Sequence, residues 1–224
     1  MSSEQDQQYQ QPPTIITLGI IIICSLVFIW QLTTGLPERY ISYGFGVTPG
    51  LLFNQHPTLI HPFPVWLTIF SSMFLHGSWL HLIGNMFYLW VFGRTIEDRI
   101  GHIRFLVFYL LCGVIAVFSH ALLDIQSMIP MIGASGAISG ILGAYLILYP
   151  QSRVLIILPL IVVFYSYWVP AWIVLLIWFV WQVAAAFIYD AQQSGIAWAA
   201  HIGGFIAGMV FIWLFTPAQQ QKPN

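Results

Sequence analysis

The sequence predicts an all-α, polytopic membrane protein whose chain crosses the bilayer six times. The first observation is the composition, because 59% of the 224 residues are hydrophobic and only 6% are charged, whereas about a quarter of the residues of a soluble domain are charged. The second is a series of apolar runs, most of them close to the ~20 residues that a helix needs to cross the hydrocarbon core. The third is the distribution of basic residues between those runs.

The chain begins with a polar tail and a first predicted span. Residues 1–13 are rich in glutamine and end in two prolines, so we expect them to be disordered. The apolar run 14–32 is long enough to cross the membrane. It lacks the positively charged start and the small-residue cleavage site of a signal peptide, so we interpret it as a retained first helix.

A long first loop follows this span. Glycine and proline recur throughout residues 35–65, yet many apolar side chains remain among them. Such a stretch is too irregular to cross lipid and too apolar to be a solvated linker. We expect it, together with its continuation over 66–75, to lie half-sunk in the membrane interface beside the bundle.

Five further spans are predicted from the remaining apolar runs. They are expected at about 78–92, 103–123, 131–149, 170–189 and 196–215. The charged stretch 93–101 is interpreted as a short loop that closes a helical hairpin. Residues 154–168 are apolar but short for a crossing, with Pro159 near their middle, so we assign them to the membrane interface.

The basic residues predict the orientation of these spans. If the N-terminus is inside, the inside segments hold Arg94, Arg99, Arg104, Arg153 and Lys222. The outside loops then hold only Arg39, as the positive-inside rule requires. A seventh span would move only the lysine, so the charges support the count of six weakly. We expect a multi-pass protein of the cell (plasma) membrane with its membrane domain over 14–216 and cytoplasmic tails over 1–13 and 217–224.

A serine between glycines, Gly133-Ala134-Ser135-Gly136, opens the fourth predicted span. A lone serine in a membrane helix usually bonds a carbonyl one turn back or a neighbouring helix. Ser135 is accompanied by other polar residues at similar positions: His201 lies near the start of the sixth span, and His81 and Asn85 lie near the start of the second. Even-numbered spans all enter from the outside. At 1.5 Å per residue, all four side chains fall in one layer roughly 5 to 10 Å below the outer surface.

Each of these side chains suits a step of acyl transfer. A serine hydroxyl needs a base to take its proton, and imidazole titrates near neutrality, so His201 is the candidate base. His81 and Asn85 are spaced i, i+4 and can donate hydrogen bonds to a developing oxyanion from one helix face. His81 could equally be the base and His201 the donor. Gly133 and Gly136 would let a substrate backbone approach and leave the serine amide free at a helix N-terminus.

Other chemistries fit less well. No histidine is followed by glutamate in the zinc-binding pattern, and His76 and His81 at i, i+5 point about 140° apart on a helix. Asp124 and Asp190 lie in predicted loops, so they cannot form an intramembrane aspartyl pair. There is no basic run or phosphate-binding loop for nucleic acid. We therefore expect no metal, no cofactor and no nucleic-acid partner.

The serine chemistry is predicted to use two residues. No acidic residue lies near His201 in the sequence, so a full triad is not expected. Ser139, one turn further along the same helix face, is an alternative nucleophile. It lies deeper and lacks the flanking glycines, so Ser135 is preferred.

These motifs resemble those of the rhomboid intramembrane serine proteases in their bacterial six-helix form. The resemblance covers about 14–215 and rests on three segments: 133–136, 76–85 and 200–204, with a further glycine at 208. It implies that Ser135 is the nucleophile and His201 its base. It also implies an oxyanion hole formed by His81, Asn85 and the Ser135 amide.

The resemblance also assigns structural parts. It implies that 35–75 form the interfacial first loop of the family and that Glu97 and Arg99 match its structural Glu-x-Arg. Two positions depart from the family pattern, because Trp66-Leu67 replaces a Trp-Arg pair and Ile196 stands where a glycine is expected. His76 is nearer a supporting residue in the family, and we expect it to be a hydrogen-bonded histidine at a loop end.

The sequence thus predicts an intramembrane serine endopeptidase that cuts transmembrane segments of single-pass membrane proteins. Its expected partners are such substrates and the lipid bilayer, and no oligomeric state is indicated. A rhomboid-like pseudoprotease that only binds transmembrane partners is the alternative, although such proteins usually lack the serine or a histidine. A transporter or channel is disfavoured, because the spans contain no acidic residues and the halves show no inverted repeat.

Overall fold

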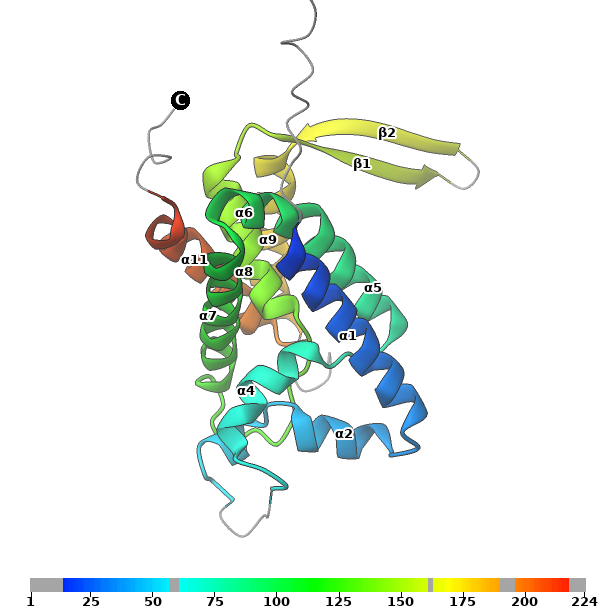
Figure 1. Ribbon diagram of the computed structural model, residues 1–224, viewed down its shortest axis with the longest axis vertical. Coiled ribbons are helices and arrows are strands. Elements are labelled where there is room, and N and C mark those ends of the chain that lie inside the picture. The colour runs from blue at the N-terminus through cyan, green and yellow to red at the C-terminus, as the bar shows by residue number, and fades with distance from the viewer. Residues whose placement is uncertain (1–13, 57–60, 161–162, 190–195, 218–224) are drawn as a thin grey trace, which may run out of the picture.

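The computed structural model describes residues 14–56, 61–160, 163–189 and 196–217, and shows a bundle of helices packed side by side (Figure 1). Four helices are long and apolar enough to cross a membrane: α1 (Ile15–Thr33), α7 (His102–Ala121), α9 (Ala171–Ile188) and α11 (Trp198–Phe215). The predicted all-α polytopic class is confirmed. The count of six spans stays a prediction, because the two other candidates are a shorter helix and a composite one.

The composite helix corrects the sequence interpretation of the second span. It runs without a break through α5 (Trp79–Tyr88), the π-helical turn η3 (Leu89–Gly93) and α6 (Arg94–Ile100). The charged stretch 93–101 is therefore not a loop, and the helix ends only at Gly101, whose φ is 85°. Charged residues are typical of loops, but the carboxylate of Glu97 in this stretch is buried and has partners within the bundle.

The helix α8 (Ser135–Leu148) starts later than the predicted 131. Met131 instead forms an isolated antiparallel bridge with Val47 of the first loop. The amide of Gly133 donates to the carbonyl of Ser72 at 2.8 Å, and this glycine has a φ of 125°. The chain is thus held extended by the first loop until it turns into α8 at Ser135.

The first loop contains only short elements. They are α2 (Glu38–Phe45), α3 (Pro49–Leu52), η1 (Val65–Leu67), α4 (Thr68–Ser71) and η2 (Ser72–Phe74). Figure 1 shows α2 and α4 lying across the end of the bundle opposite to α6. The irregular, partly apolar first loop has the expected character, and its place in the membrane interface stays a prediction.

Residues 153–160 and 163–170 depart from the helical fold. The strands β1 (Arg153–Leu160) and β2 (Val163–Pro170) pair antiparallel, with Leu155 opposite Trp168. This ribbon projects sideways at the end of the bundle that carries α6 (Figure 1). We expected only an interfacial segment here. Its β-branched and aromatic residues favour an extended chain over a helix.

The helix α8 forms the centre of the bundle, packed between α7 and α11. Every residue from Gly136 to Tyr145 is buried. A side chain at Gly143 would run into the carbonyl of Phe205, and one at Gly208 into the carbonyl of Gly140. The glycine-lined face of α8 therefore lets the main chain of α11 approach closely, as small residues allow in membrane helices.

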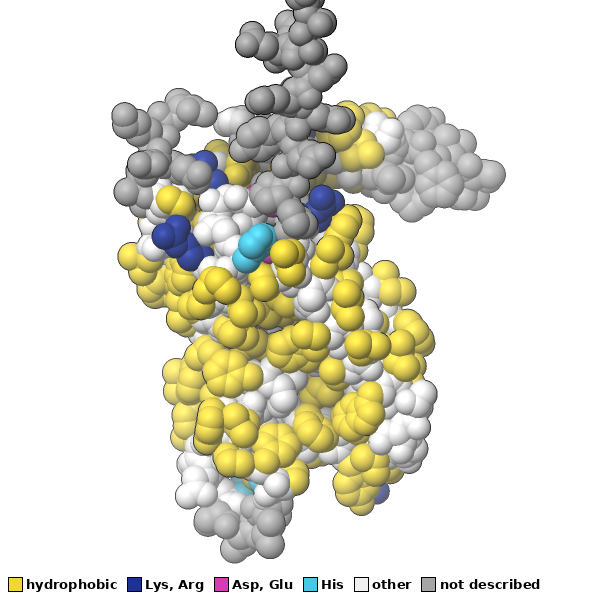
Figure 2. Space-filling model, in the orientation of Figure 1, with side chains coloured by type: hydrophobic (Ala, Val, Ile, Leu, Met, Phe, Trp, Pro, Cys, Tyr) yellow, Lys and Arg dark blue, Asp and Glu magenta, His cyan; other side chains and the backbone are white. Residues whose placement is uncertain are grey.

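The outer surface suits a lipid environment. Figure 2 shows hydrophobic side chains over most of the visible face, and dark-blue basic side chains gathered mainly at the end that carries α6. Exposed apolar residues occur on each long helix, for example Leu26 at 60%, Val107 at 51%, Ile177 at 67% and Leu214 at 77%. Contiguous apolar surface of this extent is not stable in water, so the protein is a membrane protein.

Candidate active site

Ser135 is the first residue of α8, and its position depends on the glycine two residues earlier. The φ of 125° at Gly133 lies in a region that other residues rarely adopt. A Cβ atom there would also lie 2.8 Å from the His81 ring. Gly133 is thus required twice, by the turn into α8 and by the approach of the imidazole.

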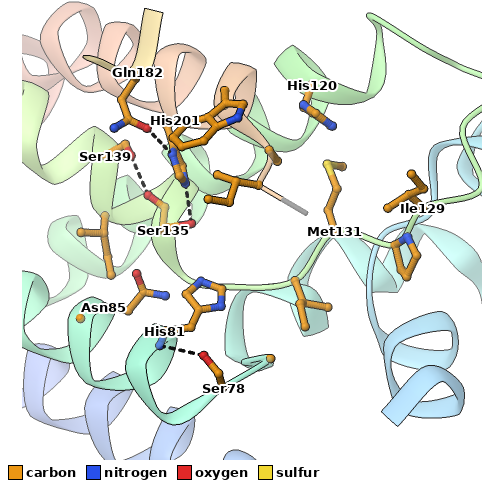
Figure 3. Close-up of a pocket in the computed structure, with 18 of the residues that line it drawn as sticks. Ser78, His81, Asn85, His120, Ile129, Met131, Ser135, Ser139, Gln182 and His201 are labelled. Atoms are coloured by element: carbon orange, nitrogen blue, oxygen red, sulfur yellow. Dashed lines mark hydrogen bonds between the residues drawn. The ribbon is translucent and has the colours of Figure 1, made fainter. Parts of the chain in front are cut away.

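A hydrogen-bonded chain of three side chains runs through the site (Figure 3). The Nε2 atom of His201, from the first turn of α11, lies 2.8 Å from the Oγ atom of Ser135. Its Nδ1 atom lies 2.7 Å from the Oε1 atom of Gln182, which comes from α9. An amide oxygen can only accept, so Nδ1 carries the proton in this arrangement. The other nitrogen, Nε2, is then free to accept from the serine hydroxyl.

His81 and Asn85 lie on the other side of Ser135, on α5 (Figure 3). The Ser78 hydroxyl caps this helix by accepting a hydrogen bond from the His81 amide at 3.1 Å. Asn85 is buried, and its Nδ2 amide has no hydrogen-bond partner in the described part of the chain. A buried donor without a partner is rare in proteins, and this one lines the same cavity as Ser135.

His76 is fully buried beside the site. Its ring centre lies 5.2 Å from that of His81, in an edge-to-face arrangement. Its main-chain N–H donates to the side chain of Gln31 at 3.1 Å, and its carbonyl accepts from that side chain at 3.0 Å. Both ring nitrogens are buried without a well-formed partner among the described residues. The backbone of His76 thus provides two hydrogen bonds at this loop end.

The two remaining candidates, Ser139 and Gly136, are engaged in contacts within the helix bundle. The hydroxyl of Ser139 donates to the carbonyl of Ser135 at 2.7 Å, and the residue is only 1% exposed. At Gly136, an added Cβ atom would lie 2.7 Å from the Cβ atom of Ala116 on α7. Gly136 therefore serves helix packing, and the space beside Gly133 is taken by the His81 ring. The expected approach of a substrate backbone to these two glycines stays a prediction.

The polar groups open into a cavity of about 860 Å³. Its walls are largely apolar and include Leu80, Tyr88, Leu142, Trp178 and Trp198. Figure 3 shows Ser135, His201, His81 and Asn85 converging on one side of it. An apolar cavity with a few convergent polar groups is typical of a binding site. Among the described residues, no group of three or more histidine, cysteine or acidic side chains is arranged to hold a metal ion.

The sequence does not predict the contacts of two polar residues, Gln182 and Glu97. Gln182 carries the only side-chain amide in α9. A single polar residue in an apolar run is the sequence feature that could have indicated its role. Glu97 accepts hydrogen bonds at 2.8 Å from the amides of Ile16 and Thr17, and so caps the start of α1. His102 adds a contact of 2.6 Å to the same carboxylate. The resemblance gave this glutamate a structural role but not its partner helix.

The fold and the site together define a polytopic helical membrane protein in which a serine at the head of the central helix is paired with a histidine of the neighbouring helix α11. A rhomboid domain matches residues 64–218, so the chain belongs to the rhomboid family, whose members are generally intramembrane serine proteases acting on transmembrane substrates.

Several curated proteins are similar to this chain. Rhomboid protein 1, mitochondrial, of Saccharomyces cerevisiae is 26% identical over 162 residues, which is 70% of this chain and 44% of that protein. RHOMBOID-like protein 5 of Arabidopsis thaliana is 30% identical over 151 residues, 66% of this chain and 44% of that protein. The mouse presenilin-associated rhomboid-like protein, mitochondrial, is 32% identical over 141 residues, 62% and 34% respectively. The chain thus spans less than half the length of these relatives.

Proposed function

We propose that the protein is an intramembrane serine endopeptidase that cleaves transmembrane segments of single-pass membrane proteins. The observation that carries this proposal is the 2.8 Å contact between Ser135 Oγ and His201 Nε2, at the edge of an apolar cavity. The apolar walls suit a hydrophobic segment, and the paired side chains suit acyl transfer.

Acylation begins when Ser135 attacks a peptide carbonyl of the substrate. The Oγ–H bond breaks, its proton moves to His201 Nε2, and a bond forms between Oγ and the carbonyl carbon. The carbonyl oxygen becomes an oxyanion. When the tetrahedral intermediate collapses, His201 gives the proton to the leaving amine, the C–N bond breaks and an acyl-enzyme remains.

The oxyanion is stabilised by donors around Ser135. The Nδ2 amide of Asn85 has no other partner in the described chain, and the His81 ring lies beside Gly133. The Ser135 amide has no intrahelical acceptor because it lies at the start of α8. Preorganised donors of this kind act where negative charge develops.

Hydrolysis of the acyl-enzyme reverses the roles. His201 takes a proton from a water molecule, whose oxygen attacks the ester carbonyl, and returns this proton to Ser135 Oγ as the ester bond breaks. The second product then leaves with a new carboxyl group.

The contacts favour His201 over His81 as the base, a choice that the sequence spacing left open. His201 is bonded to the Ser135 hydroxyl, whereas the His81 ring packs against Gly133 and His76. Ser139 is a poor alternative nucleophile, because its hydroxyl is engaged by the carbonyl one turn back.

We place the site toward the outer face of the cell membrane, with both termini on the cytoplasmic side. Arg94 and Arg99 of α6 and Arg104 at the start of α7 lie at the opposite end of the bundle from the first loop. Under the positive-inside rule, that basic end is cytoplasmic. Cysteine labelling of intact cells tests this orientation: position 128 should react with an impermeant reagent, and position 104 only after permeabilisation.

A reconstituted cleavage assay tests the function. With a single-pass substrate in liposomes, the wild-type protein should release two fragments, and Ser135→Ala and His201→Ala should each fall to background. The double variant should be no worse, because the pair acts as a unit. Ser139→Ala is the matched control and should retain most activity. Substrate binding without cleavage by the wild type would instead support a pseudoprotease.

A further inference from the structure

Gln182 lies in a helix that otherwise offers no side-chain amide or charge. It belongs to α9, whose other buried residues are Ala171, Leu175 and Ala185, and it is only 4% exposed. A polar group in a lipid-embedded helix is costly unless it is hydrogen-bonded. In this chain the amide oxygen of Gln182 is bonded to His201 at 2.7 Å, so the cost of burial is offset at the site.

The same face of α9 contacts His201 twice. Trp178, one turn before Gln182, has its indole ring centre 6.1 Å from that of the imidazole. The two residues are spaced i, i+4 and so project from one face of the helix. Trp198 packs edge-to-face against the same imidazole, with ring centres 6.2 Å apart. The imidazole therefore has two indole rings as neighbours and one acceptor at Nδ1.

The Gln182 bond determines which ring nitrogen carries the proton. The Oε1 atom accepts, so Nδ1 must be the protonated nitrogen. If Nε2 carried the proton instead, it could not accept one from Ser135. A ring without an acceptor at Nδ1 would populate both tautomers, and only one of them is competent.

We propose that Gln182 is a positioning residue that completes a Ser135–His201–Gln182 relay, in a role that an acidic residue fills in a triad. This inference rests on the proposed peptidase function. When the Ser135 O–H bond breaks and the Nε2–H bond forms, the imidazole gains a positive charge. The Gln182 carbonyl dipole, aligned with Nδ1–H, stabilises that charge without taking a proton. Gln182 remains neutral throughout, and the proton leaves with the amine product.

Two substitutions separate this role from a purely structural one. Gln182→Met keeps the length of the side chain and removes the acceptor, whereas Gln182→Glu keeps an oxygen at that place. If Gln182 only filled space, methionine would be the better replacement, because burying a carboxylate is costly and burying a thioether is not. The relay predicts the opposite order for activity. Val180→Met places a methionine on the same helix at a lipid-facing position, 63% exposed, and is the matched control.

The experiment measures kcat and KM for cleavage in liposomes, together with the melting temperature of each variant. Gln182→Met should lower kcat about 10- to 100-fold, by analogy with the loss of a hydrogen-bond partner that orients a metal-bound histidine. KM and the melting temperature should stay near the wild-type values. Gln182→Glu should recover most of the lost kcat, and Val180→Met should match the wild type.

The spectroscopic signature is independent of turnover. In histidine labelled with ¹⁵N, the His201 signals, assigned by their absence from the His201→Ala variant, should report protonated Nδ1 in the wild type and a mixture of tautomers in Gln182→Met. If the wild type cleaves the substrate and Gln182→Met has the same kcat, the relay is overturned and the peptidase function is retained. Parallel losses of kcat and melting temperature in both variants would also overturn it. A wild-type protein that neither cleaves nor labels with a fluorophosphonate would overturn the function and the relay together.

Discussion

Replacing Asn85 by leucine should lower the cleavage activity while the stability of the fold stays unchanged or rises. The Nδ2 amide of Asn85 is buried and lacks a partner in the described chain, so in the resting protein it costs free energy. An unsatisfied buried donor costs ~1–3 kcal/mol. Leucine has a similar volume and no donor, so Asn85→Leu should leave the free energy of unfolding unchanged or raise it by up to about this amount.

The same change should strongly impair cleavage. If Nδ2 donates only to the oxyanion, its loss removes an interaction that forms in the transition state, and such a donor is worth about 10²- to 10³-fold in kcat, or ~2.7–4 kcal/mol. Both kcat and kcat/KM should fall by this factor, because substrate binding is not affected.

The assay compares initial cleavage rates in liposomes with thermal unfolding in detergent. Ile83→Leu, at a lipid-facing position of the same helix that is 59% exposed, is the control and should change neither measurement. Cleavage of Asn85→Leu within about threefold of the wild type would refute the oxyanion role, since the expected loss is at least tenfold larger. A fall in stability that parallels the fall in activity would show that Asn85 is structural.

Three further predictions concern packing, the α1 cap and the substrate. Gly208→Val should lower the melting temperature and the activity together, because the valine side chain would run into the Gly140 carbonyl and overpacking costs ~1–3 kcal/mol. The control Ile206→Val, on the same helix and 48% exposed, should change neither. Equal melting temperatures for the two variants would count against a close backbone contact at Gly208. Glu97→Leu should destabilise the fold by roughly 1.5–3 kcal/mol for each lost bond to the α1 amides, as judged by thermal unfolding, whereas unchanged unfolding would mean that the cap contributes nothing. A glycine or proline in a substrate helix lowers its stability by ~1 or ~3 kcal/mol; replacing it by leucine should slow kcat more than it weakens binding, and indifference to the replacement would argue against local unwinding before cleavage.

The positions of the long helices followed largely from local patterns. The apolar runs gave α1, α7, α9 and α11 to within about two residues, as expected for long periodic segments. The start of α8 was misplaced by four residues, since 131–134 are held by a bridge to Val47 and a bond to Ser72. These partners lie far away in the sequence and leave no local pattern.

The remaining differences also come from long-range contacts or ambiguous composition. Glu97 caps α1 by accepting from an amide 81 residues earlier in the chain, and no local pattern distinguishes such a buried charge from a charged loop. Gln182 bonds His201 across 19 residues, and no motif links them. In residues 153–170, periodicity alone does not separate a short buried helix from a strand. The antiparallel pairing of β1 with β2 assigns both segments to strands.

The contact between the main chains of α8 and α11 affects how the sequence can vary. Ser135 and His201 lie on these two helices, and the glycines between them bring carbonyl groups of one helix against the other. The separation of the reacting atoms is therefore determined by backbone atoms, which every residue shares. Lipid-facing residues such as Leu214 can be substituted during evolution without moving Ser135 and His201. A single methyl group added at Gly208 cannot be accommodated, because the Gly140 carbonyl occupies that space. Tolerance to mutation should therefore fall steeply from the lipid-facing surface to the contact between α8 and α11.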